Sequence, residues 1–217
     1  MSSRSLATRL IETLPSGLPG LFNPWQDHCP HEVAGDGPPA RRGRLARHLD
    51  CDPALILVGE APGYQGCRYS GIAFTSERLL LEGAIPRIPA LPERLSTRRL
   101  PFSEPSATIV WKTLCRLGIA ERTILWNALQ LHPHRPNEPW SNRTPAPGEL
   151  ALGAAALQLL MAAFPSAKVV AVGRKAEDLL TAMGVTPAAT VRHPANGGAT
   201  LFAAGMQALC ASKPSFT

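Results

Sequence analysis

Residues 54–63 read Ala54-Leu55-Ile56-Leu57-Val58-Gly59-Glu60-Ala61-Pro62-Gly63. The first five are apolar and rich in branched side chains, which is typical of a strand buried inside a parallel sheet. The strand runs into a loop with a carboxylate, a rigid proline and two glycines, and a helical pattern follows around 79–81. Open α/β sheets bind ligands in the crevice outside the carboxyl ends of their strands. The loop at 59–63 is therefore the first candidate for a binding site.

Three more apolar runs alternate with helical patterns further along the chain, at 123–129, 168–173 and 188–191. Helices are expected at 5–14, 38–49, 106–118, 147–164, 174–183 and 200–210, and Ser106 is the expected N-cap of its helix. Four strands that alternate with helices predict a three-layer α/β/α sandwich around a four-stranded parallel sheet. We expect one domain over residues 1–217, in which an irregular and helical segment, 1–50, packs on the sandwich.

Composition and charge limit the class of protein. The 217 residues are 45% hydrophobic and 18% charged, with a net charge of +6, which is typical of a globular protein. No apolar run approaches the roughly 18–20 residues of a membrane span, and the first residues lack the apolar core of a signal peptide. We expect a cytoplasmic monomer without membrane contact. The positive charge alone fits either a nucleic-acid partner or no special role.

The cysteines and histidines indicate neither a disulfide framework nor a metal site. Five cysteines are scattered along the chain without a C-x-x-C pair, which argues against zinc and iron–sulfur clips. The groups His28-Cys29-x-His31 and His132-x-His134 lack four ligands at a usual spacing. The glycine pattern G-x-G-x-x-G, the phosphate-loop G-K-[ST] and the nucleophile elbow G-x-S-x-G are absent as well. No cofactor and no metal are therefore expected.

Two basic segments leave alternatives open. The expected helix at 38–49 carries Arg41, Arg42, Arg44 and Arg47, which fits a solvated charged face or a phosphate contact. Residues 84–106 form a long proline-rich insertion with four arginines, Arg87, Arg94, Arg98 and Arg99. Insertions of this kind tend to be lids or binding loops.

Residues that follow parallel strands meet at one edge of the sheet, so Glu60, Phe74, Asn127 and His193 should converge there. Hydrolysis of an N-glycosidic bond to a pyrimidine needs a donor for the anionic leaving base, an amide against its edge and an aromatic face to stack on. His193 can be the donor, Asn127 can read N3–H and O4 of uracil, and Phe74 can stack. Each also has a plain structural explanation, as a core ring, a turn amide or a strand-end histidine.

Five segments, taken together and in this order, are similar to the uracil-DNA glycosylase superfamily. They are Ile56-Leu57-Val58-Gly59-Glu60-Ala61-Pro62-Gly63, Gly71-Ile72-Ala73-Phe74, Trp126-Asn127-Ala128 followed by Asn142-Arg143-Thr144-Pro145 and Glu149, Val172-Gly173-Arg174-Lys175-Ala176, and Arg192-His193-Pro194. The resemblance implies the three-layer fold and removal of uracil flipped out of DNA in base excision repair. It implies that Phe74 stacks on the base, Asn127 reads its edge and His193 stabilises the leaving group. Gly59, Ala61, Pro62 and Gly63 are the expected base-binding loop.

The chain departs from the family pattern at several positions. The G-E-A-P-G form resembles a bacterial and archaeal branch that usually carries a four-cysteine iron–sulfur cluster, and those cysteines are absent here. Ala61 stands where the best-studied branch has a water-activating aspartate, so Glu60, a water held by the backbone, or Asn127 must substitute. Gly63 replaces a tyrosine that excludes the thymine methyl group, and Tyr64 or the region 69–70 are the candidates to fill that space.

The last motif bears on DNA. Ala195-Asn196-Gly197-Gly198 offers no leucine to insert into a duplex, which predicts a preference for single-stranded or mispaired substrate. Asn196, Gly197 and Gly198 precede a helix whose free amides suit a phosphate, and with Arg192 and Arg143 they are the candidate DNA contacts. A monofunctional DNA glycosylase is the favoured function. A base-binding protein of the same fold with weak or no turnover is the alternative, which Ala61 supports.

Overall fold

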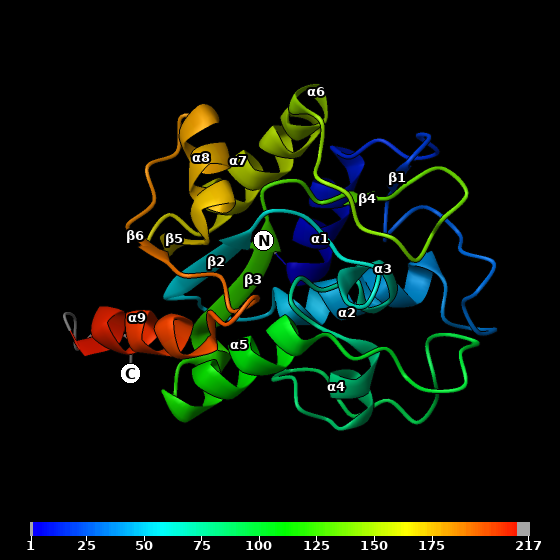
Figure 1. Cartoon of the computed structure of the whole chain (residues 1–217), viewed down its shortest axis with the longest axis horizontal. Helices are drawn as coiled ribbons and strands as arrows, with labels where there is room; N and C mark the ends of the chain where they lie inside the picture. Colours follow the sequence, from blue (N-terminus) through cyan, green and yellow to red (C-terminus); the bar gives the residue numbers. More distant parts are fainter. Residues whose placement is uncertain (1, 212–217) are drawn as a thin grey trace.

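A four-stranded parallel sheet forms the centre of the protein in a computed structural model that describes residues 2–211 (Figure 1). Its strands are β2 (Leu55–Gly59), β3 (Thr123–Asn127), β5 (Lys168–Val172) and β6 (Ala189–Val191). They lie in the order β3-β2-β5-β6. Gly59 pairs with Asn127 at the ends of β2 and β3, and Val172 pairs with Val191 at the ends of β5 and β6. The carboxyl ends of all strands therefore share one edge.

Helices cover both faces of this sheet, which confirms the three-layer α/β/α sandwich. On one face lie α1 (Ser3–Glu12), α7 (Ala154–Ala163) and α8 (Arg174–Ala182), and on the other lie α5 (Pro105–Arg116) and α9 (Ala199–Ala211). Alternation along β2 explains the arrangement, because successive side chains of a strand point to opposite faces. Ile56 and Val58 join the hydrophobic cluster under α1, α7 and α8, whereas Leu55 and Leu57 join the cluster under α5 and α9.

The remaining elements are short and lie around the sandwich. They are α2 (Pro38–His48), α3 (Cys67–Ser70), α4 (Glu77–Leu81), α6 (Pro147–Leu150), the 3-10 turns η1 (Ala120–Arg122) and η2 (Ala151–Gly153), and the antiparallel pair β1 (Leu21–Phe22) and β4 (His132–Pro133). Within residues 2–211, no helix has the length and apolar character needed to span a membrane. The assignment of 1–217 to a single domain stays a prediction.

The helix expected at 147–164 is not continuous. It is divided into α6, η2 and α7, and the break falls at Gly153. A side chain at Gly153 would place its Cβ 2.0 Å from the carbonyl oxygen of Ala128. The backbone at Gly153 thus packs directly on the loop after β3, a tertiary contact that the helical periodicity does not reveal.

Two arginines of the basic helix α2 are neither solvated nor free to bind a phosphate. Arg41 and Arg44 are buried, and they form ion pairs with Glu32 and Asp36 at 2.8 Å and 2.6 Å. Arg44 also donates from Nε to the carbonyl of Ser70. These arginines therefore connect the irregular N-terminal segment to α3. The sequence pattern shows positive charge, but not the buried acceptors that use it.

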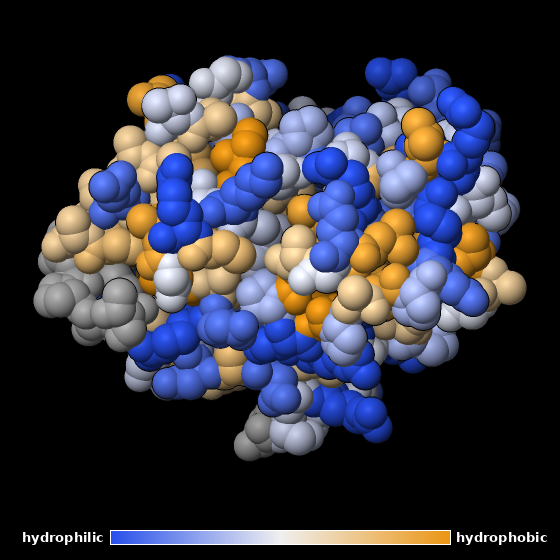
Figure 2. Space-filling view, turned by 90° about the horizontal axis from the view of Figure 1, so that it is seen from below, coloured by the Kyte–Doolittle hydropathy of each residue, from blue (hydrophilic) through white to orange (hydrophobic). Residues whose placement is uncertain are grey.

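The insertion at 84–106 is fastened by the fully buried carboxylate of Glu77 in α4. Glu77 accepts hydrogen bonds from the backbone N–H groups of Leu95, Ser96 and Phe102 and from Arg94 Nε, at 2.6 to 3.2 Å. Figure 2 shows the side of the molecule that carries α4, α5 and α9, where hydrophilic side chains are interspersed with small hydrophobic patches.

Candidate active site

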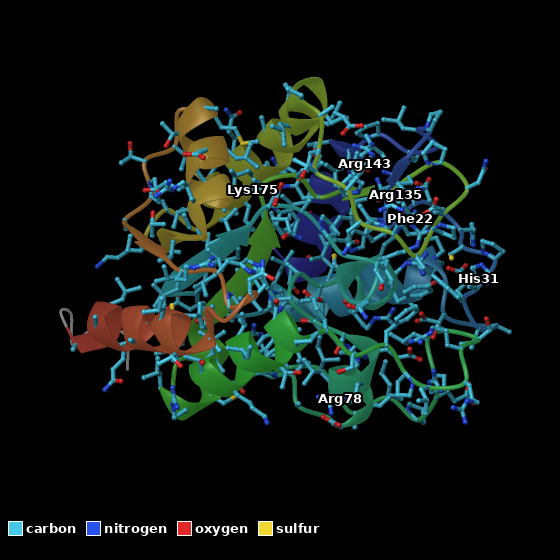
Figure 3. All side chains as sticks on the ribbon, viewed as in Figure 1. Phe22, His31, Arg78, Arg135, Arg143 and Lys175 are labelled. Carbon is cyan, nitrogen blue, oxygen red and sulfur yellow. The ribbon has the colours of Figure 1, made fainter. Side chains whose placement is uncertain are left out.

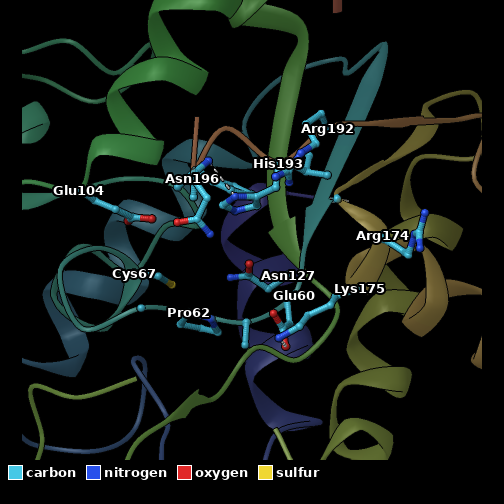
Figure 4. Close-up of a pocket in the computed structure, with 16 residues that line it drawn as sticks. Glu60, Pro62, Cys67, Glu104, Asn127, Arg174, Lys175, Arg192, His193 and Asn196 are labelled. Carbon is cyan, nitrogen blue, oxygen red and sulfur yellow. Dashed lines mark hydrogen bonds and ion pairs between the residues drawn. The ribbon is translucent and has the colours of Figure 1, made fainter. Parts of the chain in front are cut away.

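A cavity of about 410 Å3 lies at the carboxyl edge of the sheet, and we call it the strand-end cavity (Figure 4). Its volume is in the range of small-molecule sites. It brings together Glu60, Phe74, Asn127 and His193, which the strand ends predict to converge. Ala61, Pro62, Gly63, Arg192 and Asn196 of the expected site residues line it as well.

A groove of about 650 Å3 continues from this cavity, and we call it the adjoining groove. It shares Glu60, Gly63, His193 and Asn196 with the strand-end cavity and extends over other residues, among them Ile109, Asn142, Arg143 and Gly197. Gly59 and Gly198 line neither hollow. Both instead permit close packing behind the site.

Gly59 makes room for the two side chains that face each other at the end of β2. A Cβ at this position would lie 2.6 Å from Cζ of Phe74 and 2.9 Å from Oδ1 of Asn127. No real Cβ tolerates such distances, so only glycine lets this ring and this amide approach the strand end. The glycine of the predicted loop thus acts through packing.

Asn127 ends β3 with its side-chain amide directed at the cavity. The parallel ladder continues past it, because Ala128 N–H donates to the carbonyl of Gly59 at 2.8 Å and Leu129 N–H to that of Glu60 at 3.0 Å. Gln130 Nε2 donates to the backbone carbonyl of Asn127 at 2.6 Å. Among the described residues none hydrogen-bonds to the Asn127 amide group itself. A donor and an acceptor are thus held rigidly and left available to a ligand.

His193 faces the cavity as a neutral donor. Its Nδ1 accepts the backbone N–H of Ala195 at 3.1 Å, so in the neutral ring the proton is on Nε2. Burial lowers the pKa of His193, and the nearby charge of Arg192 lowers it further. Close packing fixes the ring. A Cβ at Gly173 would lie 3.0 Å from Cβ of His193, and one at Gly198 would lie 2.0 Å from its carbonyl oxygen.

Phe74 is held in an unusual backbone conformation. Its φ is 49°, in the left-handed region that non-glycine residues rarely adopt. It follows the short helix α3, which ends at Gly71 with φ 75°. The ring is buried and lies 6.0 Å from the ring of His193 at a tilt of 41°. Such strain is characteristic of functional sites, and here it places the ring at the wall of the cavity.

Glu60 carries an ion pair across the mouth of the cavity. Its Oε1 accepts a hydrogen bond from Lys175 Nζ at 3.2 Å, and the same ammonium reaches Thr144 Oγ1 at 3.3 Å. The Lys175 side chain is 62% exposed and that of Glu60 is 29% exposed, so solvent screens the pair. Lys175 and its neighbour Arg174 line the cavity, although the motif 172–176 suggested no role for them.

Glu104 and Cys67 also line the cavity, and the sequence reasoning assigned no site role to either of them. Burial raises the pKa of Glu104 to about 7. Burial and the charge of Glu104 raise the pKa of the Cys67 thiol well above its ordinary value. Glu104, and not Ser106, is the N-cap of α5, yet its carboxyl group makes no capping hydrogen bond. The sequence offered one sign of Glu104, because it is an acidic residue directly before Pro105, the first residue of α5.

The tyrosines expected to fill the space beside Gly63 do not line the cavity. Tyr64 packs edge-on against Phe102 at 5.8 Å, and Tyr69 stacks on the same ring at 4.9 Å. Cys67 and Glu104 line the cavity, whereas a Cβ at Gly63 would lie nearest to Nδ2 of Asn142, at 3.5 Å. The aromatic contacts of the insertion hold the tyrosines away, which the spacing in the sequence does not show.

Arg143 has a structural role that the DNA-contact prediction did not foresee. It is labelled in Figure 3, and it forms a two-point ion pair with Glu149 at 2.6 and 2.7 Å. Its other hydrogen bonds go to the carbonyls of Gly20, His134 and Thr144. These bonds use all five N–H groups of a guanidinium. Its contact with DNA stays a prediction, but a phosphate would have to displace an existing partner.

The arginines of the insertion are also engaged in part. Arg87 donates to the carbonyls of His48, Glu121 and Thr123, Arg94 pairs with Glu77, and Arg98 lies over the ring of Phe102. Arg192 and Asn196 are exposed at the mouth of the cavity. Across residues 2–211, no three side chains of the His, Cys, Asp or Glu type are grouped to hold a metal ion.

Comparisons with known proteins agree with this architecture. A family model described as the uracil DNA glycosylase superfamily matches residues 46–216. The fold is similar to the crystal structure of wild-type SMUG2 from Pedobacter heparinus, with a TM-score of 0.66, 13% sequence identity and coverage of 98% of each chain. At that identity the likeness concerns the fold. No curated protein matches the chain.

Proposed function

The chain belongs to the uracil DNA glycosylase superfamily, and from this premise we propose that it hydrolyses the N-glycosidic bond of uracil, or of a related deaminated base, flipped out of DNA. One observation carries the proposal. The unpartnered amide of Asn127, the Nε2–H of His193 and the ring of Phe74 face one strand-end cavity. These groups supply an edge reader, an oxyanion donor and a stacking face, which this reaction requires.

Recognition of the base follows from the Asn127 amide. Uracil presents an N–H donor beside a carbonyl acceptor, and an amide can satisfy both at once. Cytosine presents an unprotonated ring nitrogen beside an amino group, so one fixed orientation of the amide cannot pair with both bases. A buried polar group left unpaired costs about 1–3 kcal/mol. The backbone ladder with β2 runs through Asn127 and continues past it, which supports a fixed orientation.

His193 stabilises the departing base. As the glycosidic bond breaks, negative charge develops on the base oxygens, and a preorganised Nε2–H lowers the energy of that state. The lowered pKa of His193 keeps the ring neutral, so it acts as a hydrogen-bond donor without being protonated first. The carboxylate of Glu60, which pairs with Lys175, stabilises the positive charge that develops on the sugar.

Contacts with DNA are proposed for the exposed rim of the cavity. Arg192 and Asn196 lie there, and Gly197 and Gly198 precede α9, whose first N–H groups suit a phosphate. Neutralisation of phosphates by such groups makes binding salt-dependent. The loop 195–198 contains no large side chain, so the cost of extruding a paired base, a few kcal/mol, is not offset by a wedge.

This argument predicts a substrate preference. Uracil should be released fastest from single-stranded oligonucleotides, more slowly from U·G pairs and slowest from U·A pairs, because the unpairing cost rises in that order. Single-turnover rates on the three substrates test it. Equal rates on all of them would refute the preference without affecting the proposed chemistry.

Turnover itself is tested by incubating the protein with a uracil-containing oligonucleotide and cleaving abasic sites with alkali. Strand breaks at the uracil support a glycosylase, and a parallel screen of hypoxanthine, xanthine and oxidised pyrimidines identifies the preferred base. The second candidate function is a base-binding protein with weak or no turnover, which Ala61 favours because it offers no acid–base group. Binding of the oligonucleotide without strand breaks would support that candidate.

A further inference from the structure

Two carboxyl groups line the strand-end cavity, Glu60 and Glu104, and their surroundings differ. Figure 4 shows Glu104 on the side of Asn196, and Glu60 next to Asn127 and Lys175. Both also line the adjoining groove. A nucleotide with its base in the cavity and its backbone along the groove would place its sugar where the two hollows join. The two carboxyl groups would then flank the glycosidic bond.

The carboxyl group of Glu104 is positioned without any hydrogen-bond donor. It lies against the backbone of Gly66, where an added Cβ would be 2.0 Å from Oε2. Thr75 contributes only its carbonyl oxygen to the same spot. In the described part of the chain, no N–H or O–H group hydrogen-bonds to this carboxyl group, and it does not cap its own helix. Glu60, by contrast, is paired with Lys175.

Apart from Glu104 and the Lys175-paired Glu60, the groups of the cavity do not accept a proton near neutral pH. His193 uses Nδ1 to accept the Ala195 N–H, and its Nε2 already carries a proton. The Asn127 amide is not basic, and burial keeps the Cys67 thiol protonated. Arg174, Lys175 and Arg192 are cations. Ala61 has no functional group, so the water-activating role has to be filled by another residue.

We propose that Glu104 is the catalytic base that activates the attacking water, an inference that rests on the proposed glycosylase function. Glu104 takes one proton from the water as the water oxygen bonds to C1′ of the sugar. The bond from C1′ to the base nitrogen breaks, and its electron pair leaves with the base as an anion held by His193. The base then takes a proton from solvent, and Glu104 returns its proton to solvent.

The electrostatic environment of Glu104 suits this role. Burial raises its pKa to about 7, and general bases are most efficient when their pKa lies near the working pH. The titratable and charged groups around it are Cys67 of α3, Glu60 after β2, His193 and Arg192 after β6, Arg174 and Lys175 of α8, and Arg143 in the adjoining groove. None of them forms an ion pair with Glu104. Two carboxylates in contrasting environments commonly divide such roles between them.

The test is the pH dependence of single-turnover uracil release from a single-stranded oligonucleotide, between pH 5 and 9. The wild-type rate should rise with pH and level off above about 7. Glu104→Gln should lower the plateau by about 10²- to 10⁴-fold and abolish the rise, and Glu104→Asp should retain the rise at a reduced rate. Glu60→Gln should lower the rate at every pH but keep the rise. Glu12→Gln, at an exposed position of α1, is the matched control.

Two further readouts separate chemistry from folding. Carbon-13 NMR of labelled glutamate carboxyls in the free protein should show one resonance that titrates near pH 7 and is absent from Glu104→Gln. The stability of Glu104→Gln to urea should equal or exceed that of the wild type, because a half-buried carboxyl group without a hydrogen-bond partner is unfavourable. A Glu104→Gln variant with the wild-type rate and pH rise overturns the assignment while the glycosylase function stands. A wild type without activity on any base overturns the function, and the assignment with it.

Discussion

Gly59 stands where a single methyl group would collide with Phe74 and Asn127, at 2.6 and 2.9 Å. We predict that Gly59→Ala displaces the ring or the amide and lowers the rate of base release by about 10²-fold, the effect of an ångström-scale misplacement. Gly43→Ala is the matched control, since a Cβ there meets no atom within 4 Å. Single-turnover kinetics with circular dichroism of both variants test this prediction. A Gly59→Ala variant with the wild-type rate would contradict it.

Substitutions of Arg143 and Arg192 should distinguish an arginine that stabilises the fold from an arginine that binds DNA. Arg143→Gln cannot keep the two-point pair with Glu149 and the carbonyl contacts, so we predict a loss of about 1–3 kcal/mol in the free energy of unfolding. The salt dependence of DNA binding by this variant should stay unchanged. Arg192→Gln should instead keep the stability and reduce the salt slope by about 1. The reverse pattern would restore Arg143 as a phosphate contact.

Among single residues, the sequence predicts the site residues that lie at the end of a strand. Asn127 and His193 follow apolar runs, and the structure brings both to the strand-end cavity. Glu104 follows no strand. It reaches the cavity through the placement of α5 and through the absence of a side chain at Gly66, and neither fact is visible in local spacing.

Glu77 holds the insertion 84–106 in place, so the stability of the protein should depend on the ionisation of Glu77 and hence on pH. Burial opposes its ionisation, but hydrogen bonds from Arg94, Phe102, Leu95 and Ser96 outweigh burial and lower its pKa below the ordinary value of a glutamate. The stabilisation is therefore complete above about pH 4.5 and is lost as the pH falls through the lowered folded-state pKa. Glu77→Gln should cost about 3 kcal/mol or more, as expected for a broken buried ion pair.

Urea unfolding at pH 7 and limited proteolysis of the insertion check the Glu77 prediction. The variant should be cleaved within 84–106 earlier than the wild type, because the N–H groups of Leu95, Ser96 and Phe102 lose their shared acceptor. Glu82→Gln, at an exposed position after the same helix, should behave as the wild type. Equal stability of Glu77→Gln and the wild type would mean that other contacts hold the insertion.

Element boundaries show what a pattern can and cannot supply. The apolar run of β2 predicts a buried strand. The structure bears this out, because β2 lies between two other strands of the sheet. The periodicity of 147–164 predicts one helix, but the contact of Gly153 with Ala128 divides it. The charge pattern of α2 reveals an exposed face for Arg42 and Arg47 but not the buried ion pairs of Arg41 and Arg44.

Two buried histidines should set the acid stability of the whole molecule. His48 accepts the N–H of Leu125 at 2.9 Å, and His132 accepts Arg68 Nη1 at 3.0 Å. Burial, with a smaller effect of Arg87, lowers the pKa of His48 to about 3. Burial, with a smaller effect of Arg68, likewise lowers the pKa of His132 to about 3.

Between pH 6.5 and 3 the unfolded chain therefore binds protons that the folded protein does not. The free energy of unfolding should be highest above about pH 6.5 and should fall by up to about 1.4 kcal/mol per pH unit for each histidine as the pH decreases. Urea titrations from pH 7.5 to 4.5 measure this slope, and His48→Asn should reduce it. A stability that stays constant from pH 7.5 to 5 would contradict the assigned burial and neutrality of both rings.

Size-exclusion chromatography with light scattering tests the expected monomer, for which one mass of 23.2 kDa is predicted. The mixed surface of α4, α5 and α9 supports this expectation, since Figure 2 shows no broad hydrophobic area on that side. A concentration-dependent larger mass would contradict it.

Free uracil released from a single-stranded oligonucleotide, quantified by mass spectrometry, tests most directly whether the three side chains at the sheet edge act as one site. The wild type should release one uracil per oligonucleotide, and His193→Ala and Asn127→Ala should each lower the rate by about 10²- to 10³-fold with an intact fold. No uracil from the wild type, or undiminished release by both variants, would contradict the assignment.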